Sequence, residues 1–205
     1  MRNFLKIGVL GLQGAVSEHV SMFEKAFARQ KLSGQAVVVR SLEDLKQCDA
    51  LAIPGGESTT ISRLLVRDSM FDFLSSHAQA NNLPILGTCA GMVLLAKQGD
   101  KQVEKTKTRL LEVMDFKVDR NFFGGQCESF EVPLKLSFLS YSFPGIFIRS
   151  PVAENVRGGA KTVCRHNGAV VGVEQGPHLA VSFHPELSND SRIHEYFIKK
   201  VLESK

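Results

Sequence analysis

The 205-residue sequence has few of the features that mark a secreted, metal-binding or membrane protein. Its four cysteines lie far apart and form no CxxC pair, so neither a disulfide framework nor a cysteine metal site is expected. The N-terminal run MRNFLKIGVLGL is too short for a signal peptide, and polar residues follow too soon for a membrane anchor. We therefore expect a cytoplasmic protein whose thiols stay reduced.

A large excess of one charge is also missing, since the net charge is only +4. Lysine is most concentrated in KQGDKQVEKTKTR (97–109), where acidic residues interrupt it and no aromatic residue occurs. This composition is typical of a solvated loop or helix face rather than of a nucleic-acid-binding stripe. Repeats, low-complexity tracts and long linkers are absent as well. We expect one domain, residues 1–205, with no nucleic-acid or membrane partner.

What the first half does contain is an alternation of strands and helices. Apolar runs at 6–12, 35–40, 49–54 and 83–87 predict strands, and apolar residues at helical spacing predict helices at 15–30, 57–66 and 69–81. Ser58 or Thr59 is available as the N-cap of the second helix. Strands that are apolar throughout indicate a parallel sheet that is buried on both faces.

The second half has a different pattern. Short strand-like segments follow one another at 114–120, 128–132, 145–150, 161–166, 169–175 and 178–184, before an amphipathic helix at 191–205. We therefore predict an α/β fold, a single-domain open and largely parallel twisted sheet flanked by helices, with extra short strands in the C-terminal half.

Three glycine-marked turns follow predicted strands: GLQG (11–14), PGGE (54–57) and GTCAG (87–91). In an open parallel sheet, ligands collect beyond the carboxyl ends of the strands. Because all three turns lie at such ends, we expect them to face one cleft.

The turn GTCAG holds Cys89 between two glycines, and it has two interpretations. A small thiol can simply pack in a tight turn, as most buried cysteines do. Alternatively, G-x-Cys-x-G is the thiol version of the nucleophile elbow, a strained strand-to-helix turn that presents one reactive side chain to a cleft.

A cysteine nucleophile needs a base and a group that orients the base. The best candidates are His184 and Glu186 in HLAVSFHPE, because a period of two places both side chains on the same side of a strand. Pro185 is expected to end that strand. Among the other histidines, His19 and His194 fall in amphipathic helices and are predicted to lie on the surface.

The turn PGGEST also has alternative interpretations. Successive glycines can hold an anion with backbone N–H groups, but the lysine of a phosphate-binding loop is absent. The glycine amides could instead form an oxyanion hole, or the segment could be an ordinary turn.

Taken together, these motifs resemble one family. GLQGAVSEH, PGGEST, GTCAGM, RNFFGGQ with ESFE, FIRSP, FHPEL and RIHEYF occur in the order of the glutaminase subunits of pyridoxal 5′-phosphate synthase and span nearly the whole chain. These subunits are class I (triad-type) glutamine amidotransferases with a flavodoxin-like fold. GTCAG with HPE indicates only the broad class, whereas GLQGAVSEH and RNFFGGQ narrow it.

The resemblance implies a role for each matching residue. Cys89 attacks the side-chain amide of L-glutamine, His184 moves the protons and Glu186 orients His184. The product ammonia goes to a barrel-type synthase subunit in a hetero-oligomeric complex, with no cofactor or metal in this chain. Further residues are implied to bind glutamine (Gly55, Gly56, Glu57, Arg120, Ile148 and Arg149) or to form the oxyanion region (Ala90, Gly56 and Gln13).

In one place the chain departs from the family pattern, because Gly125 precedes Gln126 where family members usually carry arginine. The change leaves Arg120 and the triad untouched, so it bears on a surface or partner contact. Two alternatives remain at this stage: a glutaminase subunit of a histidine or nucleotide pathway, and a non-catalytic binding subunit with the same fold.

Overall fold

The computed structural model describes residues 4–120, 122 and 129–205. Its strands are β1 Leu5–Leu10, β2 Gly34–Val39, β3 Ala50–Ile53, β4 Ile85–Thr88, β5 Ala96–Gln98, β6 Met114–Asp119, β7 Phe130–Leu134, β8 Phe143–Phe147, β9 Val152–Glu154, β10 Lys161–His166, β11 Ala169–Gln175 and β12 His178–Val181. Its helices are α1 Val16–Gln30, α2 Leu42–Lys46, α3 Ser58–Arg67, α4 Phe71–Gln79, α5 Ala90–Leu95, α6 Lys101–Thr106, the 3-10 turn η1 Pro185–Leu187 and α7 Arg192–Glu203.

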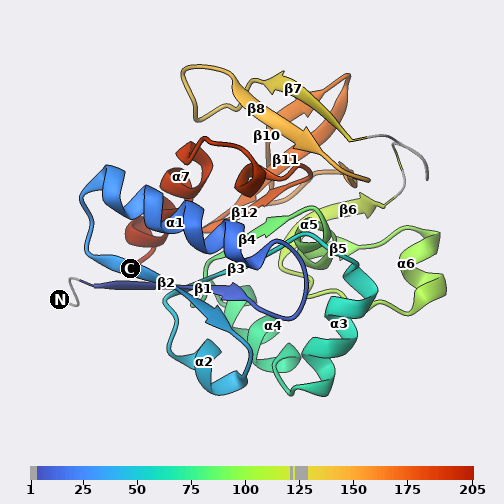
Figure 1. The fold of residues 1–205 in the computed structure, drawn as a ribbon. Helices are drawn as coiled ribbons and strands as arrows, with labels where there is room; N and C mark the ends of the chain where they lie inside the picture. The colour runs from blue at the N-terminus through green and yellow to red at the C-terminus, as the bar shows by residue number, and fades with distance from the viewer. Residues whose placement is uncertain (1–3, 121, 123–128) are drawn as a thin grey trace.

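The central sheet has ten strands in the order β2-β1-β3-β4-β12-β11-β9-β6-β5, with β10 paired to β11 (Figure 1). Strands β1 to β4 and β12 run parallel, whereas β9, β10 and β11 make antiparallel pairs. A second sheet consists of β7 and β8. The predicted α/β fold, a largely parallel sheet with extra strands from the second half, is confirmed.

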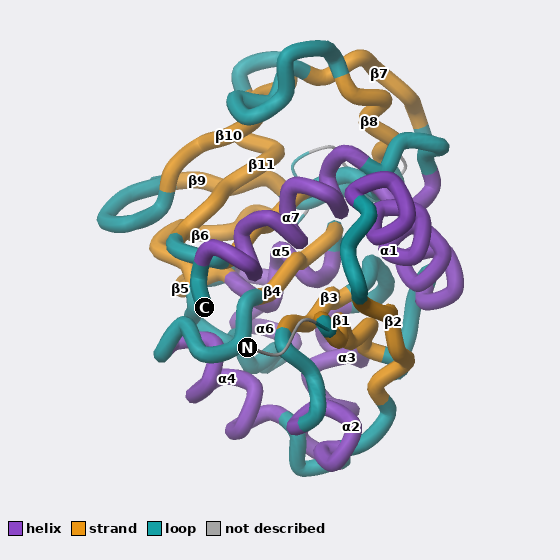
Figure 2. The backbone as a smooth tube through the Cα atoms, turned by 90° about the vertical axis from the view of Figure 1, so that its left-hand side faces the viewer, coloured by secondary structure: helices purple, strands orange, loops and turns teal. Residues whose placement is uncertain are grey.

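Helices cover both faces of the parallel strands, as Figures 1 and 2 show. Helices α1 and α7 pack on one face, where Phe23 and Phe197 lie in a core with strand residues such as Ile7. Helices α2, α3, α4 and α5 contribute to the core on the other face. Burial on both faces explains why these strands are apolar at every position.

Strand β12 is the element that matters most for the site. It comes from the far end of the chain, yet it pairs in parallel with β4, with Leu179 opposite Leu86 and Val181 opposite Thr88. The carboxyl ends of these two strands therefore lie side by side. The segment after β12 carries His184 and Glu186, and the residue after β4 is Cys89.

Two local predictions were wrong in detail. The strand predicted at 178–184 ends at Val181 rather than at Pro185. Neither Ser58 nor Thr59 caps α3; Glu57 does, because its carboxylate accepts the backbone N–H groups of Thr59 and Thr60. The prediction for the lysine-rich segment, a solvated loop or helix face, is confirmed: it contains α6, whose N-cap is Asp100, and its lysines are exposed.

The predicted surface position of His19 and His194 was also wrong, since both side chains are completely buried. On α1, His19 shares one helical face with the buried residues Met22 and Phe23. On α7, His194 lies on the buried face with Phe197. The two helices pack against each other through these faces, with the ring of Phe23 edge-on to that of His194.

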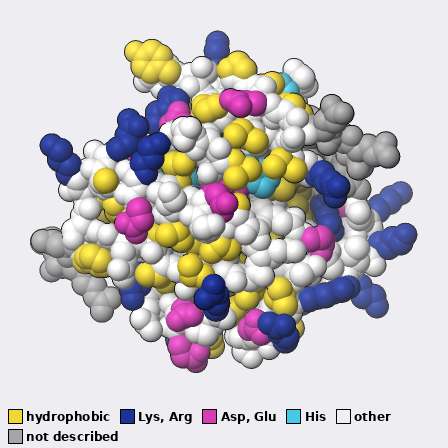
Figure 3. All heavy atoms as spheres, viewed as in Figure 1, with side chains coloured by type: hydrophobic (Ala, Val, Ile, Leu, Met, Phe, Trp, Pro, Cys, Tyr) yellow, Lys and Arg dark blue, Asp and Glu magenta, His cyan; other side chains and the backbone are white. Residues whose placement is uncertain are grey.

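On the face drawn in Figure 3, Lys and Arg side chains lie mainly near the margins, with acidic side chains among them. In the described part of the chain, no helix has both the length and the apolar character needed to cross a bilayer.

Candidate active site

Cys89 occupies the turn between β4 and α5, in a backbone conformation that is rare for a residue with a side chain. Its φ is 49° and its ψ is −101°. The turn is held from behind, because the backbone N–H of Cys89 donates to the carbonyl oxygen of Val181 at 2.8 Å. Strain of this kind persists only where the surrounding structure enforces it, and it is found at nucleophile elbows. The elbow interpretation of GTCAG is therefore favoured by the backbone.

The glycines on either side of Cys89 allow close packing. A Cβ on Gly87 would lie 2.7 Å from the carbonyl carbon of Gly91, and one on Gly91 would lie 2.3 Å from the carbonyl oxygen of Ile53. Helix α5 thus begins directly against the ends of β3 and β4. Its first turn contains the backbone N–H of Ala90, one of the groups that a helix cannot pair internally.

The predicted His–Glu pair is present. Nδ1 of His184 lies 2.7 Å from Oε1 of Glu186, and because a carboxylate only accepts, Nδ1 carries the proton. The pair comes together through the 3-10 turn η1, for which His184 is the N-cap, and not through strand alternation. Both residues are buried, at 7% and 3% exposure.

The electrostatics of the pair favour a charged imidazole. Burial alone lowers the pKa of His184, but hydrogen bonds with Cys89 and Glu186 and the charge of Glu186 outweigh it and raise this pKa to about 10. Burial raises the pKa of Glu186, but interactions with the His19 and His184 rings lower it by more than that, so the net change in this pKa is a decrease. An imidazolium beside a cysteine favours the nucleophilic thiolate form.

Cys89 also opens onto a cavity of about 380 Å³. Seven predicted site residues line it, together with three that the sequence did not indicate; the full lining is Gln13, Gly56, Glu57, Ser58, Cys89, Ala90, Val93, Arg120, Arg149 and Pro151. Ile148 adjoins it, since the thiol of Cys89 lies 3.8 Å from the Ile148 carbonyl oxygen. Gly55 lies beside His184. The structure thus brings all the predicted residues to one region.

The two glycines of PGGE are placed by close contacts. A Cβ on Gly55 would lie 2.3 Å from Cε1 of His184. Gly56 has a φ of +146°, a conformation that side chains disfavour. The carboxamide Oε1 of Gln13 accepts the backbone N–H of Glu57 at 2.9 Å. The GLQG turn therefore fixes the PGGE turn, which accounts for Gln13 in the cavity wall.

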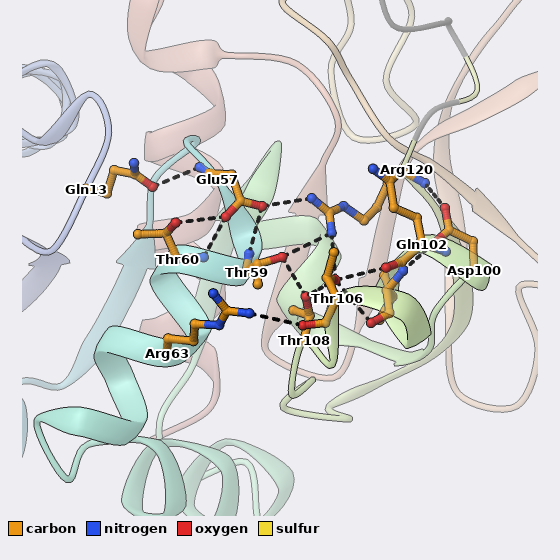
Figure 4. Close-up of polar contacts among 11 residues, drawn as sticks. Gln13, Glu57, Thr59, Thr60, Arg63, Asp100, Gln102, Thr106, Thr108 and Arg120 are labelled. Carbon is orange, nitrogen blue, oxygen red and sulfur yellow. Dashed lines mark hydrogen bonds and ion pairs between the residues drawn. The ribbon is translucent and has the colours of Figure 1, made fainter.

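Glu57 and Arg120 bind each other in this structure (Figure 4). Oε1 of Glu57 accepts Arg120 Nη2 at 2.9 Å and the Thr59 N–H at 3.0 Å. Oε2 accepts the N–H and the hydroxyl of Thr60. Desolvation raises the pKa of Glu57, but these hydrogen bonds from Thr59 and Thr60 outweigh it and hold the pKa at about 2. The carboxylate is thus ionised and fully occupied.

Arg120 and Arg149 differ in their surroundings. The backbone N–H of Arg120 donates to Asp100, and its guanidinium reaches Thr59 and Thr106 as well as Glu57. Arg149 follows β8 with a φ of 46° and is exposed. Among the described residues it forms no ion pair.

Sequence reasoning missed the residues behind the triad. Nε2 of His19 lies 3.4 Å from Oε2 of Glu186 and 3.2 Å from the hydroxyl of Thr88. The available signal was the position of His19 three and four residues before the apolar Met22 and Phe23 on α1. Gly125, the departure from the family pattern, lies outside the described residues. Within them, no group of three or more His, Cys, Asp and Glu side chains could hold a metal ion.

A cysteine elbow at the carboxyl edge of a parallel α/β sheet, with a His–Glu pair just after the neighbouring strand, is consistent with the class I type of glutamine amidotransferase that the sequence resembles. Residues 9–203 match the model of the SNO glutamine amidotransferase family. The chain belongs to this family, and the predicted recognition is confirmed.

Proteins similar to this chain support the same family assignment. Pyridoxal 5′-phosphate synthase subunit PdxT of Thermococcus onnurineus is 48% identical, over 97% of this chain and 100% of its own length. The protein of the same name from Pyrococcus furiosus is 47% identical, again over 97% of this chain and 100% of its own. A solved structure titled as a glutamine amidotransferase superposes with a TM-score of 0.83 at 40% identity, covering 95% of this chain and 98% of that one.

Proposed function

We propose that this chain is the glutaminase subunit of a pyridoxal 5′-phosphate synthase, and that it hydrolyses L-glutamine to L-glutamate and ammonia. The observation that carries the chemistry is the strained Cys89 elbow beside the 2.7 Å pair of His184 and Glu186. The full-length similarity to proteins named pyridoxal 5′-phosphate synthase subunit PdxT supports the pathway.

In the first half of the reaction, the sulfur of Cys89 attacks the side-chain amide carbon of glutamine. Negative charge then develops on the amide oxygen. We assign the stabilisation of this charge to the backbone N–H of Ala90 and to one N–H from the turn of Gly55 and Gly56. His184, as imidazolium, gives its proton to the departing nitrogen, so that ammonia leaves and a γ-glutamyl thioester remains on Cys89.

In the second half, water attacks the thioester. His184 removes a proton from this water, and the thiolate of Cys89 leaves as glutamate forms. Glu186 keeps the proton of His184 on Nδ1, so that Nε2 is the nitrogen that exchanges protons with the reacting groups.

The substrate's two charged groups need opposite partners. Arg149, which has no ion-pair partner among the described residues, is suited to bind the α-carboxylate. We assign the α-ammonium to Glu57, as the resemblance implies. Because all four acceptor positions of Glu57 are used in this structure, the ammonium has to replace Arg120 Nη2 there. Arg120 then turns toward the substrate.

The proposal also covers the domain organisation, the partner subunit and the compartment of the reaction. We treat residues 1–205 as one amidotransferase domain, which the family match over residues 9–203 supports. The ammonia acceptor is a barrel-type synthase subunit in a hetero-oligomeric complex. We place the reaction in the cytoplasm, where free thiols such as Cys48, Cys89 and Cys164 stay reduced.

The test is glutamate release by the purified chain with a pyridoxal 5′-phosphate synthase subunit, with an unrelated amidotransferase synthase, and alone. We expect glutamate release to be low for the chain alone and to rise only with the first partner, and pyridoxal 5′-phosphate to form from glutamine only with that partner. Stimulation by a histidine- or nucleotide-pathway synthase instead would support the alternative pathway. Binding of glutamine without release under any condition would support a non-catalytic subunit.

A further inference from the structure

A buried row of imidazoles continues behind the triad. Nδ1 of His19 lies 3.1 Å from Nε2 of His194, and Nε2 of His19 faces Oε2 of Glu186 at 3.4 Å. Both added histidines are completely buried. The row joins α7 to α1, α1 to η1 and η1 to the elbow, and it reaches Cys89 through Glu186 and His184.

The carboxylate oxygen of Glu186 that faces away from His184, Oε2, depends on His19 for a polar contact. Oε1 accepts from His184, but Oε2 is buried and accepts no hydrogen bond among the described residues. Leaving a buried carboxylate oxygen without a compensating polar contact is costly. Nε2 of His19 is the group that faces this oxygen in ion-pair range, so it supplies the compensation.

The contacts select one tautomer for His19. If its Nδ1 carried the proton, Nε2 would bring a lone pair within 3.4 Å of the ionised carboxylate, and the proton of His194 would sit on its own buried, unpartnered Nδ1. Both consequences are unfavourable. If Nε2 carries the proton instead, the N–H of His19 donates to the Thr88 hydroxyl and places its positive hydrogen near Oε2 of Glu186, and His194 donates from Nε2 to His19. Nδ1 of His194, the atom left without a partner, then carries only a lone pair and no proton.

We propose that His19 is a positioning residue that acts through Glu186, with His194 fixing the His19 tautomer, so that Glu186 stays ionised and holds His184 in place. The proposal rests on the triad assigned above. His194 faces Nδ1 of His19, and Nε2 of His19 lies between the Thr88 hydroxyl and Oε2 of Glu186. His184 donates to the other oxygen of the carboxylate. The hydroxyl oxygen of Thr88 lies within hydrogen-bond distance of Nε2 of His19, at 3.2 Å.

The charges around His19 agree with this role. Burial lowers its pKa most, while Glu186 and Glu18 raise it and His184 lowers it, for a net decrease. Burial and His19 also lower the pKa of His194. Both rings are therefore neutral near pH 7, and they contribute directed N–H groups rather than positive charge.

The experiment compares His19→Phe, His19→Gln and the matched control His178→Gln in the complex with the synthase. His178 is also buried, but it bonds the backbone of Ile85 and Ala78 rather than the triad. For His19→Phe we expect kcat to fall about ten-fold with KM within about two-fold, because substrate contacts are untouched. The acid limb of its kcat/KM profile should move up by about one pH unit, since Glu186 loses stabilisation of its ionised form.

His19→Gln restores an N–H at the position of Nε2 and should return both parameters to within about three-fold of the wild type. The control should change thermal stability without moving the pH profile. An unchanged pH profile in a folded His19→Phe enzyme overturns the proposal, and so does an acid limb in His19→Gln that is moved as far as in His19→Phe.

A second measurement does not depend on activity. In ¹⁵N-histidine NMR spectra of the wild-type chain, we expect His19 to be neutral and protonated on Nε2 near pH 7. Protonation on Nδ1 overturns the proposal even if the Phe variant does not fold. If the wild type releases no glutamate, the proposed function fails separately, and the tautomer is still measured.

Discussion

Substitution of Gly55 by alanine tests whether the position of His184 controls catalysis. The added methyl group would lie 2.3 Å from Cε1 of His184, 3.1 Å from Nδ1 and 3.3 Å from Nε2. Gly55 is not among the described residues with positive φ, so its backbone accepts alanine without strain. The change therefore acts on the imidazole and leaves the chemistry of all three triad side chains intact.

The size of the effect follows from the required movement. An approach of 2.3 Å has to open by about 1 Å to reach ordinary carbon–carbon contact near 3.5 Å. His184 is held by Glu186 on one side, so the ring has to change its position relative to its partners. A misplacement of about 1 Å costs roughly 100-fold in rate. We also expect the crowding to lower stability by about 1–3 kcal/mol.

The assay is steady-state glutamate release in the presence of the synthase, with thermal unfolding of each variant. Gly159→Ala is the matched control, because its Cβ would have its nearest neighbours at 3.5 Å and the position has no positive φ. We expect the control to keep wild-type kcat. Wild-type kcat in a folded Gly55→Ala enzyme would refute the reasoning, because the imidazole could then move without loss of rate.

Three further predictions use the same assay. Glu186→Gln should lower kcat less than His184→Ala, since an orienting group is easier to replace than the base itself; equal, negligible losses in both would remove this pair from the mechanism. Arg149→Ala should raise the KM for glutamine by roughly ten-fold or more, on the scale of a charge-assisted hydrogen bond; an unchanged KM with reduced thermal stability would show that Arg149 only packs. The isolated chain should have low activity that rises about ten-fold or more with the synthase, because the PGGE turn depends on Gln13 and a partner that touches the GLQG turn can select its active conformation; full activity without the partner would show that the turn is already preorganised.

Local sequence patterns predicted the strands and helices of the first half well, because strands buried on both faces are apolar throughout and α1 has a clear helical period. They also located Cys89, His184 and Glu186. The contact between His184 and Glu186 was expected from strand alternation, but β12 ends at Val181 and the 3-10 turn brings the two residues together. The prediction was right for a different geometric reason.

Long-range pairing could not be read from local patterns. The insertion of β12 beside β4 joins segments about a hundred residues apart, and only this pairing brings His184 to Cys89. The surface prediction for His19 failed because polarity was taken as exposure. A histidine can lie on a buried helix face when polar groups satisfy it there, as Glu186 and His194 do for His19.

The most direct test of the central claim uses an electrophilic glutamine analogue, such as a diazoketone, followed by peptide mass spectrometry. Burial raises the pKa of both Cys48 and Cys164 to about 11, so these thiols should react slowly. We predict one adduct per chain, on Cys89, formed in proportion to the loss of glutaminase activity, prevented by glutamine and absent in Cys89→Ser. Loss of activity with Cys89 unlabelled, or full activity with Cys89 labelled, would contradict the account.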